Sequence, residues 1–201
     1  GTLNLTLSTL KGLIEEIENP EILGKLEPTI STVMLKKWEQ AGPVGGQDQG
    51  GEFVVFLIVD VIATMATSPL ARMGLQQRLL PPMFHLLQTR EQQVGGNIGA
   101  SLEVFQHVIG NSTPPLASAI ITEVFPIVCE LVGTADDNAI IINATNCLTC
   151  FVRLCINNEL NQNFNFRNAA NNNVTTANGI EAILNVTFRL LDVSNESMQD
   201  Q

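Results

Sequence analysis

The chain has 201 residues, of which 45% are hydrophobic and 15% are charged, a balance that excludes an intrinsically disordered chain and predicts an extensive buried core. Twenty Asp and Glu against ten Lys and Arg give a net charge of −10, which repels phosphate backbones and anionic lipid, so we expect no direct nucleic-acid binding and no membrane association. The longest apolar run, Phe53 to Val59, is far shorter than the roughly 20 residues that cross a bilayer.

Helical periodicity dominates the sequence, and convincing period-two strands are missing. Leu7, Leu10 and Ile14 share one helical face near the start, and Met34 and Trp38 share another further on. No signal peptide is visible, and because the first residue is glycine rather than methionine we expect a piece cut from a longer protein. The expected helices cover about 7–19, 26–38, 52–67, 73–90, 97–110, 116–133, 137–157 and 179–192.

Two segments interrupt the helical pattern. Residues 41–51 are rich in glycine and are expected to form a loop without packed structure. Residues 158–178 are rich in asparagine and are expected to form a flexible insertion.

An internal repeat organises the helices. Pro69-Leu70-Ala71 matches Pro115-Leu116-Ala117 at an offset of 46 residues, and each is followed by a further proline, Pro81 and Pro126. A repeat of about 45 residues built from two helices is in the HEAT and armadillo range. We therefore expect an all-α protein, an α-solenoid of about four HEAT-like helix pairs in a single domain, residues 1–201. The expected pairs are about 3–40, 52–90, 96–133 and 137–192.

Residues 134–155 contain the residues most suggestive of chemistry, a CxxC pair and a third cysteine. Cys147 and Cys155 fall on an apolar helical stripe, whereas Cys150 is expected to project away from it. Structural cysteines are the favoured interpretation. A redox site would need a βαβ setting and zinc would need about four converging ligands, and both stay open as alternatives.

Other features point away from catalysis. His85 and His107 have no nucleophile beside them and are expected to pack or cap helices. We expect no enzyme activity, no metal and no cofactor. Six N-x-S/T sequons are attributed mainly to the asparagine-rich composition, with a secreted glycoprotein as the alternative. The sequons begin at Asn4, Asn111, Asn143, Asn173, Asn185 and Asn195.

With the repeats aligned, several strings resemble the karyopherin-β family of nuclear transport receptors, in their C-terminal third. The strings "GNSTPPLASAIITEVFPIV" (110–128) and "GTADDNAIIINATNCLTCFVRL" (133–154) carry the resemblance most clearly. "LEPTISTVMLKKWEQ", "MGLQQRLLPPMFHLL" and "ILNVTFRLLD" extend it over nearly the whole chain. The Gly-rich loop and the Asn-rich insertion depart from the family pattern.

The resemblance implies a segment of a nuclear import receptor. Such receptors carry basic cargo, including core histones, between cytoplasm and nucleus, and Ran in its GTP form controls release. The Ran-binding repeats lie mainly at the N-terminal end of the full receptor, which this chain lacks. A generic HEAT-repeat scaffold for protein–protein interaction is the alternative function.

In this family the second helices line the cargo-binding face, so acidic residues there or at nearby turns are the candidates for cargo contact. Each could equally be an ordinary solvated carboxylate. Two lie in the first expected pair, Glu27 and Glu39. The favoured candidates are Glu123, Glu130, Asp136, Asp137 and Glu181.

Overall fold

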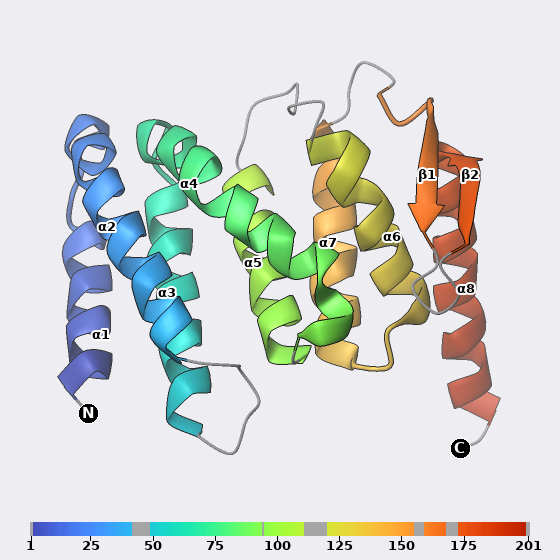
Figure 1. The fold of residues 1–201 in the computed structure, drawn as a ribbon, viewed down its shortest axis with the longest axis horizontal. Coiled ribbons are helices and arrows are strands. Elements are labelled where there is room, and N and C mark those ends of the chain that lie inside the picture. The colour runs from blue at the N-terminus through green and yellow to red at the C-terminus, as the bar shows by residue number, and fades with distance from the viewer. Residues whose placement is uncertain are drawn as a thin grey trace. The chain divides into compact units, whose positions relative to one another are not determined.

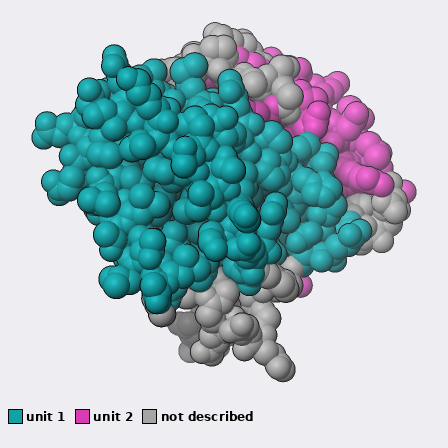
Figure 2. Space-filling view, turned by 60° about the vertical axis from the view of Figure 1, so that its left-hand side comes forward, with its two compact units in different colours: residues 1–112 teal, residues 113–201 magenta. Residues whose placement is uncertain are grey.

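The structure is a computed structural model that describes residues 2–41, 49–93, 95–110, 120–154, 159–167 and 173–199. These residues are mostly helical and group into two compact units, residues 1–112 and 113–201 (Figures 1 and 2). The boundary between the two units falls inside the helix pair expected at residues 96–133. No helix in the described ranges is long and apolar enough to cross a membrane.

The first unit is built from five α-helices in its described part. They are α1 (Thr2–Glu15), α2 (Pro20–Ala41), α3 (Gln49–Ala66), α4 (Pro69–Gln88) and α5 (Gly95–Gly110), with a 3₁₀ turn, η1 (Arg90–Gln92), before α5. Helices α1, α3 and α5 pack side by side in one layer, and α2 packs on α4 in the other (Figure 1). Helix α3 also contacts α2 and α4, and α4 contacts α5, so the two layers bury their apolar faces on each other.

The apolar periodicity explains which faces of these helices are buried. Ile58, Ile62 and Met65 recur at spacings of four and three along α3 and are at most 2% exposed. Each such side chain contributes about 1.5–3 kcal/mol when it is fully buried. The other large, fully buried side chains of this unit are Met34, Leu75, Leu79, Leu87, Leu102, Phe105 and Ile109.

Prolines help to set the boundaries of α4. Pro69 occupies the first helical position, where its missing N–H costs no hydrogen bond. Three residues later Arg72 donates from Nε to the carbonyl of Ala66 at 2.9 Å, which satisfies an orphan acceptor at the C-terminal end of α3. The helix then continues through Pro81 and Pro82. The interior proline expected from the repeat pattern is therefore present in α4.

The helix ends differ from those expected. Helix α1 begins at Thr2 rather than Leu7, and α2 begins at Pro20 rather than Leu26. The expected loop 41–51 is shorter than predicted, because Ala41 ends α2 and Gln49 already opens α3; its centre, 42–48, lies outside the described residues. The expected turn at Pro114 and Pro115 also lies outside them.

The second unit combines helices with a β-hairpin. It contains a π-helical turn, η2 (Ile120–Val124), followed by α6 (Phe125–Thr134), α7 (Asn138–Leu154), β1 (Asn163–Arg167), β2 (Val174–Asn178) and α8 (Gly179–Gln199). Helix α6 packs against α7, α8 and β1, and β2 contacts α8.

The mostly helical fold agrees with the expected all-α class, to which the hairpin adds one small two-stranded sheet. The hairpin corrects the expectation of a flexible insertion for residues 163–167 and 174–178. Strands β1 and β2 pair antiparallel, with Phe164 opposite Ala177. Phe164 is only 2% exposed, and its ring centroid lies 4.8 Å from that of Phe125 on α6. Phe125 in turn makes an edge-on contact with Phe151 of α7, with the two ring centroids 5.8 Å apart. An aromatic cluster therefore fixes β1 onto α6 and α7.

Helices α6 and α8 run in the same direction. Gly179, the first residue of α8, lies so close to Phe164 that an added Cβ would stand 2.7 Å from that ring, and Phe164 contacts Phe125 at the start of α6. Arg189, further along α8, lies beside Gly133 in the last turn of α6. The start of α8 is thus level with the start of α6.

Candidate functional site

The cysteines of the CxxC pair are buried. Cys147 is fully buried, and Cys150 is only 7% exposed, so the expectation that Cys150 projects away from the apolar stripe is wrong. Both lie on α7, which packs against α6. Cys155 lies outside the described residues. Within the described ranges no three His, Cys, Asp or Glu side chains come together in a group that could hold a metal ion.

Cys129 on α6 is also a buried, free thiol in the described part of the chain. Burial raises its pKa to about 12, because the thiolate would lose its hydration. Burial likewise raises the pKa of Cys150, with the positive charge of Arg153 acting in the opposite direction. Thiolates are the reactive species, so these two cysteines have the properties of packing residues rather than nucleophiles.

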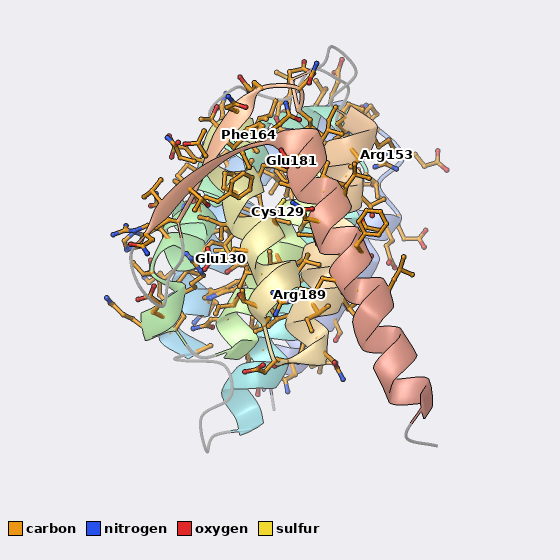
Figure 3. The ribbon with its side chains drawn as sticks, turned by 90° about the vertical axis from the view of Figure 1, so that its right-hand side faces the viewer. Cys129, Glu130, Arg153, Phe164, Glu181 and Arg189 are labelled. Carbon is orange, nitrogen blue, oxygen red and sulfur yellow. The ribbon has the colours of Figure 1, made fainter. Side chains whose placement is uncertain are left out.

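The five favoured carboxylates are distributed along the second unit and do not converge. Glu123 on η2 and Glu181 in the first turn of α8 are exposed and lie toward the end where α6 and α8 begin. Glu130 is half-buried on α6 (Figure 3). Asp136 and Asp137 are exposed in the connection that follows α6. They present a dispersed acidic surface rather than one pocket.

Asp137 has a structural role as well. Its Oδ1 accepts a hydrogen bond from the backbone N–H of Ala139 at 2.8 Å, in the first turn of α7. This is the bond of a helix N-cap, which satisfies an otherwise orphan donor. Asp136, one residue earlier, is exposed.

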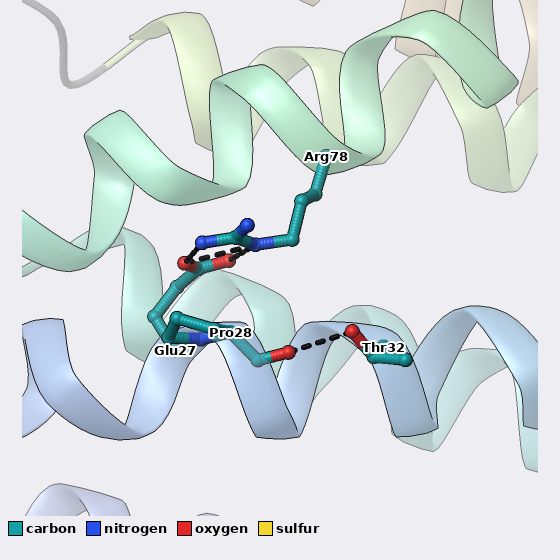
Figure 4. Close-up of polar contacts among 4 residues, drawn as sticks. All are labelled: Glu27, Pro28, Thr32 and Arg78. Carbon is teal, nitrogen blue, oxygen red and sulfur yellow. Dashed lines mark hydrogen bonds and ion pairs between the residues drawn. The ribbon is translucent and has the colours of Figure 1, made fainter.

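Glu27 is not available to a partner, and its place among the candidates is wrong. It is 1% exposed, and its carboxylate accepts three hydrogen bonds from Arg78 of α4 (Figure 4). Nε donates to Oε1 at 3.1 Å and to Oε2 at 3.2 Å, and Nη2 donates to Oε2 at 2.6 Å. Hydrogen bonding to Glu27 raises the pKa of Arg78. The pair joins α2 to α4, and the carboxylate faces the neighbouring helix rather than solvent.

Gly74 makes room for this ion pair. A Cβ atom at Gly74 would overlap the carboxylate of Glu27. Position 74 is helical, where alanine is normally favoured over glycine by about 1 kcal/mol. The glycine is explained by the volume of the Glu27 side chain.

A cavity of about 440 Å³ opens between α2, α4 and the start of α5. Its walls are largely apolar, and Trp38 from α2 and Met83 from α4 are among them. Glu39, the remaining candidate of the first unit, lines it and is exposed. The described residues that line it are Leu35, Trp38, Glu39, Pro82, Met83, His85, Leu86, Gln93 and Asn97.

Sequence reasoning missed this cavity. His85 was expected to pack or cap; it is exposed at the cavity. His107 lies 3.9 Å from Glu103 one turn earlier on α5. The sequence features that could have indicated the cavity were Trp38 on α2 and the Pro81-Pro82 pair on α4. Helical periodicity alone does not reveal that these elements leave a space between them.

No protein-family model matches the chain.

Proposed function

We propose that the chain is a segment of a karyopherin-β nuclear import receptor of the importin-9 type, which binds basic proteins such as core histones through an acidic helical surface. The observation that carries the proposal is the combination of a net charge of −10 with a two-layer helical stack. Such stacks bind proteins along extended surfaces, and an acidic field steers basic partners toward them.

The packing of the first unit supports the solenoid interpretation. In a HEAT-type solenoid each helix pair stacks on the next, so that first helices form one layer and second helices the other. The contacts of α1 with α3 and of α3 with α5 in one layer, and of α2 with α4 in the other, support this interpretation. We propose that the series of four pairs continues through the second unit, with the hairpin as an insertion in the last pair.

In the cell the proposed receptor moves between cytoplasm and nucleus, and Ran in its GTP form controls release through other parts of the receptor. The five favoured carboxylates are proposed as cargo contacts. Four of them, Glu123, Asp136, Asp137 and Glu181, are exposed, and Glu130 is half-buried. Because exposed pairs contribute only about 0–1 kcal/mol each, cargo affinity would arise from many of them together.

A generic HEAT scaffold is the second candidate. It is favoured by an exposed apolar stripe on α8, where Ile180, Leu184, Phe188 and Leu191 are between 46% and 61% exposed. Contiguous apolar faces of this kind mark protein–protein contact surfaces. The two candidates differ in the charge they require of a partner.

A matched pair of charge variants tests the proposal. In the first variant Glu123, Glu130 and Glu181 become Gln, and Asp136 and Asp137 become Asn. The control neutralises five exposed carboxylates of the first unit instead, Glu15, Glu16, Glu18, Glu21 and Glu91. Both variants lose five negative charges, so a nonspecific effect of net charge is the same in each.

The readout is the dissociation constant for core histone dimers by fluorescence anisotropy at low salt. We expect the first variant to bind at least about tenfold more weakly than the control, which corresponds to about 1.4 kcal/mol. Equal affinities for the two variants would refute the role of the five carboxylates. No binding of histone dimers by the unaltered chain would refute the proposed function and leave the scaffold.

A further inference from the structure

The cavity beside Trp38 has an apolar interior. Trp38 and Met83 are 6% and 2% exposed, so both are fixed by the surrounding core. Leu35, Pro82 and Leu86 are more accessible and complete the apolar part of the wall. A volume of about 440 Å³ falls within the range of roughly 300–1,000 Å³ that ligand pockets occupy. An apolar side chain of a partner would find a preformed site here.

The charge at this cavity has one sign. Glu39 is exposed and has no hydrogen bond or ion pair within the described part of the chain. Among the described residues that line the cavity there is no Lys or Arg. Lys37 lies two residues before Glu39 in the sequence, and its Nζ donates to Oε1 of Gln40 at 3.0 Å. No hydrogen bond or ion pair within the described residues occupies the carboxylate of Glu39, so it is accessible to a cation of a partner.

The end of α2 adds to the negative potential. Glu39 lies two residues before Ala41, the last residue of the helix. Carbonyl groups at a helix C-terminus carry a partial negative charge, which favours cations within the last turn. The last turn of α2 contains no arginine, lysine or histidine. The C-terminal end of α2 and the carboxylate of Glu39 therefore both make the electrostatic potential at the cavity more negative.

We propose that this cavity is a docking site for a segment of a basic protein, in which an apolar side chain enters beside Trp38 and an adjacent Lys or Arg pairs with Glu39. The assignment rests on the proposed function, since it names a point at which basic cargo is bound. The proposal commits to a protein segment with both features, an apolar anchor and a neighbouring positive charge.

The sequence provides its own reporter for this site. Trp38 is the single tryptophan, and the chain has no tyrosine, so intrinsic emission excited above 280 nm reports on the cavity wall alone. The probe is a capped peptide, acetyl-Gly-Ser-Arg-Arg-Leu-Arg-Arg-Ser-Gly-amide, titrated at low salt. Two companion peptides replace either the central Leu by Ser or all four Arg by Glu. We expect a saturable change in Trp38 emission with the first peptide only.

Charge reversal at Glu39 has a matched control on the same helix. Glu39→Lys converts attraction into repulsion and should weaken binding of the arginine peptide about tenfold. Glu21→Lys makes the same change in net charge at the other, exposed end of α2, and should change the affinity less than twofold. Equal effects of the two variants would overturn the proposal, as would equal binding of the glutamate peptide.

Histone binding by the same protein separates this proposal from the proposed function. If core histone dimers bind at low salt while the arginine peptide leaves Trp38 emission unchanged, the docking site is refuted and the proposed function stands. If neither binds, both are refuted. Saturable binding of the arginine peptide that Glu39→Lys weakens supports the site even if histones are not the natural cargo.

Discussion

The buried carboxylate of Glu27 is held by Arg78, 51 residues away in the sequence. Arg78 keeps 37% of its side chain exposed, whereas the Glu27 side chain keeps 2%. Removing one member of such a pair leaves an uncompensated buried group, which is more costly than the net contribution of the pair. Nothing in the local pattern around Glu27 distinguishes it from the exposed carboxylates, because burial depends on α4. The sequence therefore predicted the helix but not the ion pair.

Gly74→Ala should destabilise the protein, although the same change in an ordinary helix stabilises by about 1 kcal/mol. The added methyl group overlaps the Glu27 carboxylate and displaces it from Arg78. We expect a loss of about 1–3 kcal/mol in the free energy of unfolding, measured by urea titration of Trp38 emission. In a Glu27→Ala background the space is free, so Gly74→Ala should then stabilise. The same sign in both backgrounds would contradict the steric explanation.

Cys129 should resist alkylation in the folded protein. Its pKa of about 12 keeps the thiol protonated at pH 8, and burial blocks access. We expect no iodoacetamide adduct on Cys129 by mass spectrometry in buffer and full modification in urea. An Asn185→Cys variant, at an exposed position of α8, is the control that should react without denaturant. Rapid native-state modification of Cys129 would show that α6 is less well packed.

The same thiol predicts a direction of pH dependence. Its pKa is raised from an ordinary value of 9.0, so the folded state holds the proton more tightly than the unfolded state. The resulting stabilisation is complete below about pH 9 and is lost as the pH rises toward 12. Cys129→Ala should therefore show a smaller fall in the free energy of unfolding between pH 8.5 and 10.5. An unchanged fall would contradict the assignment.

Among the elements, the apolar periodicity located the eight α-helices that the described residues contain. The stripe at spacings of three and four is buried in helices such as α3 and α7, whereas in α8 it is exposed. The hairpin was missed for a different reason. Phe164 and Phe166 alternate with polar residues as in a strand, but the abundance of asparagine around them favours a flexible segment. The strands are held by a tertiary contact, in which the ring of Phe164 packs against that of Phe125 on α6. For the candidate site, the sequence likewise predicted which carboxylates could contact a partner, but not where these residues lie relative to one another in the fold.

Phe164→Ala tests whether the hairpin is an integral part of the second unit. A buried phenylalanine replaced by alanine costs about 3–5 kcal/mol, measured as the change in the free energy of unfolding by circular dichroism in urea. Phe188→Ala is the control, since Phe188 is 61% exposed and should change stability by less than about 0.5 kcal/mol. Equal costs for the two variants would contradict the role of the aromatic cluster.

At the scale of the whole molecule, charge and helical architecture together define the proposed activity. Twenty acidic residues are set against ten basic ones, and one of the acidic residues, Glu27, is already neutralised by an internal partner. Those that remain exposed act through a long-range field rather than through one cluster. Net charge could be predicted from composition alone. The positions of the charges on the surface could not be predicted from composition, because they depend on which helix faces are buried.

The salt dependence of histone binding tests whether exposed carboxylates bind the basic cargo. The dissociation constant of the chain for core histone dimers is measured by fluorescence anisotropy from 50 to 300 mM salt. Over this range the Debye length falls from about 14 Å to about 6 Å, so attraction between exposed charges is progressively screened. We expect binding at 50 mM salt that weakens at least about tenfold by 300 mM. Absence of binding at 50 mM salt, or an affinity independent of salt, would contradict it.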